Sequence, residues 1–138
     1  MKTASTAMVL AGAALVASCS TATAQPERTA RESAELAKAL QGRTAGAPLR
    51  CIPNWRASNM QIVDDWTILF KDGRTVYVQN PRGGCPGIGN GRNTLVTRLW
   101  GTGQLCSGDI SHLVDPSSGI GGGACVFSDF VPYTRTAG

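Results

Sequence analysis

The sequence predicts a mainly β protein: a small antiparallel barrel or sandwich of five to six strands with two disulfides, preceded by a short N-terminal helix. Three observations lead to this fold class. After residue 50, short runs of β-branched and aromatic residues recur, glycine-rich turns separate them, and none of them has helical periodicity. Four cysteines in the same region complete the pattern of a small domain held together by disulfides.

Residues 1–24 have the features of an export signal. A positively charged start precedes the apolar run AMVLAGAALV at 7–16, which is too short to span a bilayer. Two cleavage signals follow. The motif VASC matches a lipobox and predicts lipidation of Cys19, whereas ATA before Gln25 matches an ordinary signal-peptidase site. Because cysteine is scarce and alanine is abundant here, we favour Cys19, and Ser20 after it is compatible with sorting to the outer membrane.

Residues 25–50 predict a helix and a linker. Thr29 and Glu32 have the spacing of a capping box, alanines recur at helical intervals, and Gly42 stands where a helix C-cap is expected. The apolar face is small, so the helix either lies on the β domain or is only partly formed in the free protein. The segment TAGAP at 44–48 is typical of a linker.

Residues 51–138 form the predicted disulfide-bonded β domain, and the hairpin at 64–79 is its clearest element. Two apolar runs meet at the DG sequence at 72–73, which favours a type I′ turn and places Leu69 opposite Val76. Both faces of this hairpin are mostly apolar. Each face must therefore be covered, by a sheet that closes on itself or by other elements.

The rest of the domain alternates between extended and glycine-rich segments. The segment 93–100 alternates as a strand, further extended pieces are expected at 104–106 and 110–114, and the last strand at 125–132. The glycine-rich segments 80–92 and 119–123 lack the GK[ST] sequence and the following helix of a phosphate-binding loop. We expect both to be turns.

Cys51, Cys85, Cys106 and Cys125 predict two disulfides, each worth about 2–4 kcal/mol in a domain of this size. Spacing alone does not choose among the three pairings. No C-x-x-C spacing occurs and His112 is the only histidine, so we expect no metal site and no cofactor.

The net charge of +4 is unevenly distributed. Residues 25–50 carry five basic and three acidic side chains, and residues 51–138 carry seven and six. No basic face with interleaved aromatic residues is apparent, which argues against a nucleic-acid partner. We expect membrane contact only through a lipid anchor at Cys19.

Several short motifs of the β domain carry a resemblance to other proteins. They are RCIP at 50–53, IVDDWTILF at 62–70, VYVQNPR at 76–82, LVT at 95–97, LCSGD at 105–109 and DFVPY at 129–133. Together they resemble a family of small exported alphaproteobacterial proteins of unknown function, for which no catalytic residues are established. Some members have only the first and third cysteine, which implies pairing of Cys51 with Cys106 and of Cys85 with Cys125.

Candidates for catalysis are few. Asp109, Ser111 and His112 are close in sequence, but on a strand Asp109 and Ser111 share one face while His112 points to the other. We expect His112, in line with Ile110 and Val114, to be a core or edge histidine. Asp109 is expected to accept backbone hydrogen bonds in its own turn. We therefore expect that the protein is not an enzyme.

The tryptophans are candidates for binding. Trp66 and Trp100 lie within strand patterns and are expected in the core, whereas Trp55 beside Arg56 stands in a polar segment and is a candidate exposed anchor.

These features predict a non-enzymatic binding or structural module of the cell envelope, with an envelope protein or a glycan as partner. It would face the periplasm, anchored to the outer membrane through Cys19 or otherwise secreted as a soluble protein. One alternative is a secreted inhibitor of a hydrolase such as lysozyme or a protease, with the loop 80–92 entering the active site. A further alternative is a hydrolase that uses Asp109 and His112.

Overall fold

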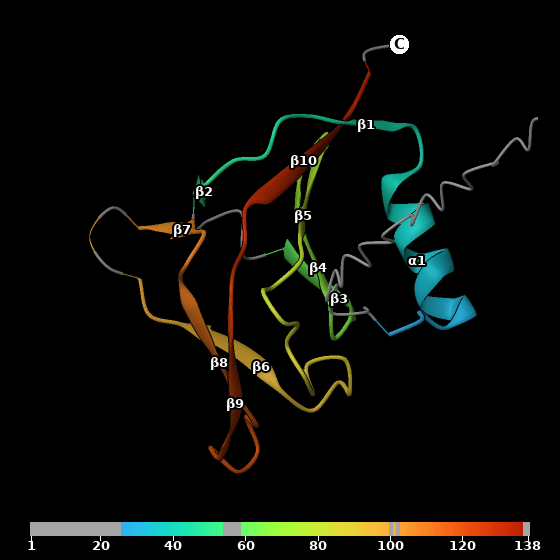
Figure 1. Cartoon of the computed structure of the whole chain (residues 1–138). Coiled ribbons are helices and arrows are strands. Elements are labelled where there is room, and N and C mark those ends of the chain that lie inside the picture. Colours follow the sequence, from blue (N-terminus) through green and yellow to red (C-terminus); the bar gives the residue numbers. More distant parts are fainter. Residues whose placement is uncertain (1–25, 54–58, 100, 102, 137–138) are drawn as a thin grey trace, which may run out of the picture.

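The computed structural model of the chain describes residues 26–53, 59–99, 101 and 103–136. The described chain is mainly β, as predicted, with one helix and ten strands arranged in three sheets (Figure 1). The expected export signal at 1–24, with Cys19, lies outside the described residues, as do Trp55, Arg56 and Trp100.

The largest sheet has five antiparallel strands in the order β1-β10-β5-β4-β3. Its strands are β1 (Arg43–Ala45), β3 (Met60–Asp64), β4 (Thr67–Asp72), β5 (Thr75–Gln79) and β10 (Phe130–Arg135). A second sheet pairs β2 (Cys51–Pro53) with β7 (Gln104–Cys106), and a third has the order β6-β8-β9, with β6 (Thr94–Thr97), β8 (Ile110–Val114) and β9 (Gly121–Val126).

The number of strands exceeds the five to six predicted because β1, β2 and β3 were not expected and the predicted last strand forms two strands, β9 and β10. β1 and β2 have only three residues each. Such short strands show no readable alternation. Within the described residues the three sheets do not close on one another, so the barrel alternative was wrong.

The predicted hairpin forms from β4 and β5, but its turn differs from the expected one. Asp72 pairs with Thr75, so the turn residues are Gly73 and Arg74. Gly73 has a φ of +53°, while no described non-glycine residue has a positive φ. Glycine at the first turn position with an ordinary second residue is the pattern of a type II′ turn, not of the type I′ turn expected.

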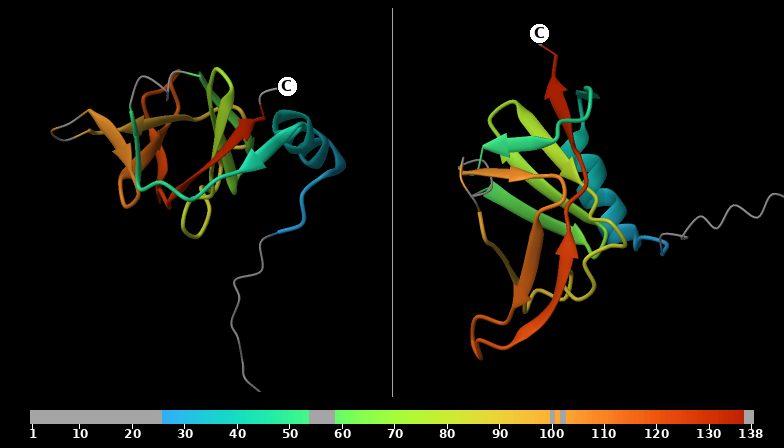
Figure 2. Two further views of the ribbon diagram at one scale, coloured as in Figure 1. Left: turned by 90° about the horizontal axis from the view of Figure 1, so that it is seen from above. Right: turned by 60° about the vertical axis from the view of Figure 1, so that its left-hand side comes forward.

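The hairpin register therefore differs by two residues from the expected one. Leu69 lies opposite Val78 instead of Val76. Because side chains alternate with a period of two, a shift of two residues leaves each side chain on its predicted face. Both apolar faces are covered by other elements: α1 (Ala30–Leu40) lies on one face, and the segments of the two smaller sheets lie on the other (Figure 2).

The helix α1 begins with the predicted capping box. The Thr29 backbone N–H donates to the Glu32 carboxylate at 2.7 Å, and the Glu32 N–H donates to the Thr29 hydroxyl at 3.3 Å. Leu36, Ala39 and Leu40 pack against the buried side chains of β3, β4 and β5. The helix thus lies on the domain, and the segment after it is only partly a linker, because β1 pairs with β10.

Arg28 adds a polar contact between the start of the helix and the sheet. Its Nε donates to Asp64 Oδ2 at 2.5 Å and its Nη2 donates to the Thr67 hydroxyl. Asp64 and Thr67 are both buried. This contact fixes the N-terminal end of α1 on the domain, while the leucines fix its C-terminal end.

The main core lies on the other face of the hairpin. Its buried residues are Ile52, Ile68, Phe70, Tyr77, Leu105, Phe127 and Phe130. The rings of Phe70, Phe127 and Phe130 have centroids 5.8–6.2 Å apart in tilted and edge-to-face arrangements, the geometry that aromatic pairs prefer. These residues join segments from all parts of the β domain.

The predicted last strand at 125–132 is two strands in the structure. β9 ends at Val126, and after a short break β10 enters the five-stranded sheet. The fully buried Gln79 holds this break: its Nε2 donates to Ser128 O at 2.8 Å and its Oε1 accepts from Ser128 N at 2.9 Å. Gly121 and Gly123, expected in a turn, instead pair with Val114 and Leu113 around a bulge.

Two disulfides join Cys51 to Cys106 and Cys85 to Cys125, which confirms the pairing that the family resemblance implied. The first bond links β2 to β7 directly across their pairing. The second bond attaches the loop after β5 to β9. Disulfides persist outside the reducing cytosol, so the two bonds indicate a protein that functions outside the cytoplasm. No helix in the described part of the chain has the length and hydropathy that crossing a membrane requires.

Candidate functional site

The three-stranded sheet β6-β8-β9 has one face in the core and one face exposed. Ser111 and Leu113 of β8 are fully buried, and Cys125 of β9 lies opposite Ser111. The alternate residues Ile110 and His112 are exposed. The disulfide at Cys125 thus sets which face is turned inward.

Side chains from all three strands and one loop form the exposed face, which we call the outer face. One row across the strands contains Val96, His112 and Ala124, and the next contains Ile110 and Val126. Arg82 extends the second row, because it forms an isolated bridge with Val126. Residues in register share a face of the sheet. The outer face is therefore defined by Arg82, Val96, Arg98, Ile110, His112, Ala124 and Val126.

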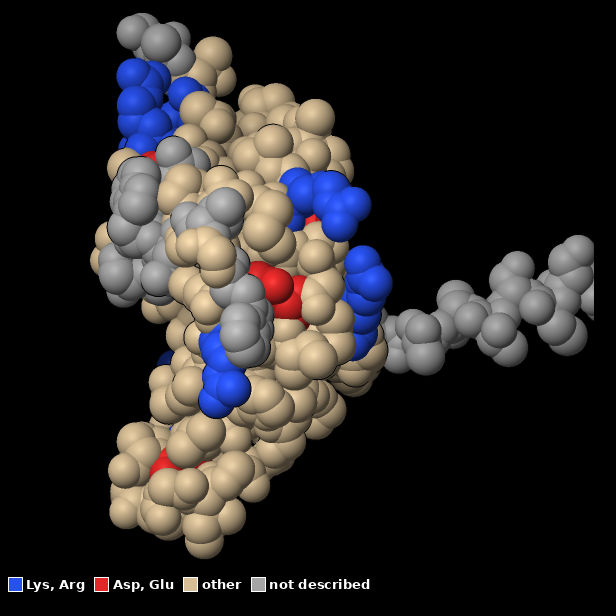
Figure 3. Space-filling model, turned by 90° about the vertical axis from the view of Figure 1, so that its left-hand side faces the viewer, with Lys and Arg blue, Asp and Glu red and all other residues tan. Residues whose placement is uncertain are grey.

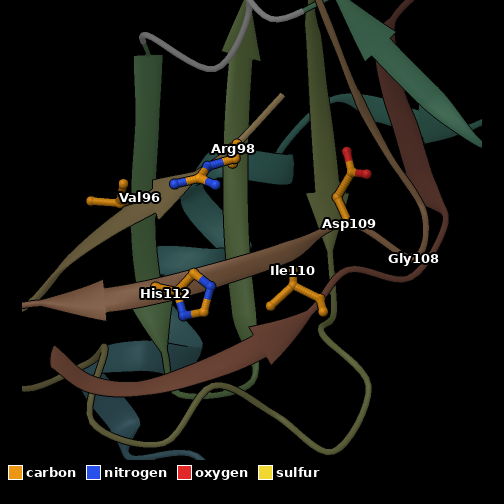
Figure 4. A pocket seen from close by; sticks show the side chains of 6 residues that line it. All are labelled: Val96, Arg98, Gly108, Asp109, Ile110 and His112. Carbon is orange, nitrogen blue, oxygen red and sulfur yellow. The ribbon is translucent and has the colours of Figure 1, made fainter. Parts of the chain in front are cut away.

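A hollow of about 510 Å³ lies over the outer face. Figure 4 shows the residues that line it: Val96, Arg98, Gly108, Asp109, Ile110 and His112. Val96 and Ile110 are 50% and 53% exposed, two of the four large apolar side chains that are most exposed in the described structure. The hollow is an open surface feature with an apolar floor and basic groups beside it.

The charged groups of the outer face are mostly basic. Arg98 extends over it (Figure 4), and Arg82 lies at its edge with Nη2 donating to Ser107 Oγ at 3.3 Å. Asp109 lines the hollow too, but its Oδ2 accepts the Cys106 backbone N–H at 2.7 Å. On the side of the molecule in Figure 3, basic side chains form separate groups, and the lower part, at the end of the β8–β9 hairpin, is mostly uncharged.

Asp109, Ser111 and His112 do not converge. The Asp109 carboxylate accepts the N–H in its own turn, as predicted, and points away from the imidazole of His112 (Figure 4). The Ser111 hydroxyl lies on the inner face and hydrogen-bonds to that of Thr97. His112 is exposed on the central strand β8, so its expected place in the core or at an edge was wrong.

Trp66 also differs from its expected place. It stands in the turn between β3 and β4 and is partly exposed, not within a strand in the core. Its ring lies over Gly84, where a Cβ would come within 3.1 Å of the indole. Gly84 has a φ of +78°. Glycine is therefore favoured at this position both by the positive φ and by the close approach of the Trp66 ring.

The loop at 80–92 is folded onto the domain. Cys85 and Ile88 are fully buried, and the Asp65 carboxylate accepts the backbone N–H groups of Gly87 and Gly89 at 3.1 and 2.7 Å. Asp65 O also accepts the Cys85 N–H at 2.6 Å. The middle of the loop is thus held to the domain and does not project from it.

All four cysteines of the β domain are in disulfides. Among the residues that the structure describes, no group of three or more His, Cys, Asp or Glu side chains could hold a metal ion. The outer face can therefore offer a partner apolar contacts, guanidinium groups and one imidazole.

Sequence reasoning missed the outer face, although it recognised that Ile110 and His112 point the same way. Both sides of the strand at 93–100 carry apolar residues, so alternation did not tell which side is exposed. The signal lay in the disulfide: once Cys125 is known to bond to Cys85, its register with Ser111 identifies the inner side.

A scan of family models and searches of curated proteins and solved structures found no match to this chain.

Proposed function

We propose that the protein is a non-enzymatic binding module of the bacterial cell envelope and that the outer face docks a protein partner. In this proposal the chain faces the periplasm and is held at the outer membrane by a lipid on Cys19. The observation that carries the proposal is the exposure of Val96 and Ile110, which lie diagonally across β6 and β8 on a face that also carries Arg98 and Arg82. Apolar groups with arginine are the composition of protein interfaces.

The chemistry of the outer face indicates the kind of partner. Its apolar residues in the described structure are aliphatic, which favours a protein over a glycan, because sugars usually stack on aromatic rings. Arg82 and Arg98 favour a partner that presents carboxylates around an apolar side chain. The described residues thus fit an acidic-rimmed protein surface.

A non-enzymatic role is supported by the directions of the candidate catalytic groups. Nucleophilic or general-base catalysis needs a base within hydrogen-bond reach of the group that it activates. The hydroxyl of Ser111 and the imidazole of His112 lie on opposite faces of the sheet, and the Asp109 carboxylate bonds to a backbone N–H.

Site-specific photocrosslinking tests the proposal. A photoreactive phenylalanine analogue placed at Ile110 in the full-length protein should give a discrete adduct with an envelope protein in living cells. Ile120 is the matched control, because it is 70% exposed and lies in the loop between β8 and β9, away from the outer face. The same analogue there should give no such adduct.

The partner found in the adduct is then purified, and its affinity for the protein shows whether the crosslink reflects specific binding. Ile110→Glu should abolish binding, because it places a carboxylate where the partner presents carboxylates, while Ile120→Glu should leave the affinity unchanged. Equal adducts from both positions, or no adduct from Ile110, would contradict the proposal. An adduct from Asn90 in place of Ile110 would assign binding to the loop at 80–92 and support the inhibitor alternative.

A further inference from the structure

A row of three arginines, which we call the arginine row, crosses one end of the five-stranded sheet. Arg43 lies directly opposite Arg135 in the β1–β10 pairing. Arg74, in the turn between β4 and β5, comes next: Arg135 N donates to Arg74 O at 3.2 Å, and Arg74 Nη2 donates to Arg135 O at 3.4 Å. Like charges placed opposite one another destabilise a sheet, so the arginine row opposes folding.

The arginine row borders a cavity of about 450 Å³ between the end of α1 and the tip of the β4–β5 hairpin. Arg43 and Arg135 line this cavity, together with Lys38 of the helix and Lys71 of β4. In Figure 1 the end of α1, β1 and the end of β10 lie together at the top of the molecule. Cations from a helix, a turn and three strands thus meet at one place.

The acidic residues of this region do not balance its cations. Lys38, Lys71 and the arginine row supply five positive charges, and Glu35 and Asp72 supply two negative charges, which leaves a net charge of +3. The Glu35 carboxylate also accepts a hydrogen bond from Arg31 at 3.0 Å. The cavity is therefore electropositive.

The surroundings of Arg43 show how closely the cations are packed. Its Nε donates to Ala39 O at 3.1 Å and its Nη1 donates to Arg74 O. Burial lowers the pKa of the Arg43 guanidinium, and the charge of Arg135 lowers this pKa further. An anion between the two guanidinium groups would relieve this repulsion.

Neutralisation of the helix end explains only part of the cluster. Lys38 and Arg43 lie at the C-terminus of α1, where the helix dipole favours a cation, and Arg43 donates a hydrogen bond to the carbonyl of Ala39. Neutralisation of the helix end does not account for Arg135, because a second arginine opposite Arg43 raises the energy of the folded protein.

We propose that the arginine row and the adjoining cavity bind a phosphate group. Guanidinium groups bind phosphate through paired N–H donors with fixed geometry, and the cavity is of the size of a small-ligand site. The phosphate belongs either to a small soluble molecule or to a phospholipid headgroup. This site is separate from the outer face and does not depend on the docking of a protein there.

Two probes distinguish the sources. Isothermal titration of the full-length protein with inorganic pyrophosphate measures binding of a soluble phosphate. Cosedimentation with phosphatidylcholine vesicles that contain phosphatidylglycerol, compared with phosphatidylcholine vesicles alone, measures binding to headgroups. Arg135→Gln should weaken whichever binding occurs by about tenfold, the effect of losing one charge-assisted interaction.

Arg92→Gln is the matched control, because it removes the same charge from an exposed residue that does not line the cavity. It should change binding by less than about twofold, as expected for an uninvolved charge screened by salt.

Arg135→Gln should also keep or raise the melting temperature, since it removes a like-charge pair. If this variant is nevertheless destabilised, Lys71→Gln at the exposed edge of the cavity takes its place. Binding of neither probe, or equal weakening by Arg92→Gln and the cavity variants, would overturn the proposal.

Discussion

Replacing Cys85 and Cys125 with alanine should destabilise the protein more than replacing Cys51 and Cys106, although the Cys51–Cys106 bond closes the longer loop. The two bonds span 40 and 55 residues, respectively. In the chain-entropy treatment each contributes about 4 kcal/mol, and the difference in loop length is worth only about 0.3 kcal/mol. Loop length alone therefore slightly favours the Cys51–Cys106 bond.

Burial reverses this order. Cys85 and Cys125 are 0% and 4% exposed and pack with Ile88 and Leu113. The cysteines of the other bond are only partly buried. Removing two buried sulfur atoms, each comparable to a methylene group, adds about 1–2 kcal/mol. The Cys85/Cys125 double variant should thus lose about 5 kcal/mol and the other about 4 kcal/mol.

Equilibrium unfolding in urea under oxidising conditions, followed by circular dichroism, compares the two double variants. Complete unfolding of the Cys85/Cys125 variant in buffer, while the Cys51/Cys106 variant remains folded, would satisfy the predicted order. Equal stabilities, or the reverse order, would refute the argument that burial outweighs loop length.

Two further predictions concern polar contacts. Arg28→Ala should lower the free energy of unfolding by about 2 kcal/mol because it leaves the buried Asp64 carboxylate without its ion pair. Arg31→Ala, at a side chain that is 86% exposed, should cost less than about 0.5 kcal/mol, and equal losses in urea unfolding would be inconsistent with this account. Gln79→Met, which preserves volume, should cost about 2–3 kcal/mol because it removes two hydrogen bonds between the fully buried Gln79 side chain and the partly buried backbone of Ser128. Hydrogen exchange of the Ser128 amide should become faster, and unchanged protection would contradict the role assigned to Gln79.

Local signals predicted the helix and the faces of the central hairpin. The capping box at Thr29 and Glu32 acts within four residues, so the sequence contains all of it. The hairpin register was harder, because Gly73 can take a positive φ as either the first or the second turn residue. The chain uses it as the first.

Structural features that depend on pairing between segments far apart in the sequence could not be predicted. β9 includes Gly121 and Gly123 because pairing with β8 overrides the low strand propensity of glycine. The exposure of His112 depends on which face of β8 meets the core. The arginine row exists only because β1 pairs with β10, and no sequence feature near Arg43 indicates that Arg135 lies opposite it.

The rate at which diethylpyrocarbonate modifies His112 tests the central claim most directly. The chain has a single histidine, so mass spectrometry of the peptide that contains His112 follows the modification of one imidazole, and the structure exposes this imidazole on the outer face. The purified full-length protein should react at the rate of an exposed imidazole, and the same protein in intact envelopes should react several-fold more slowly because a docked partner covers the outer face. Equal rates in the two preparations would contradict the account.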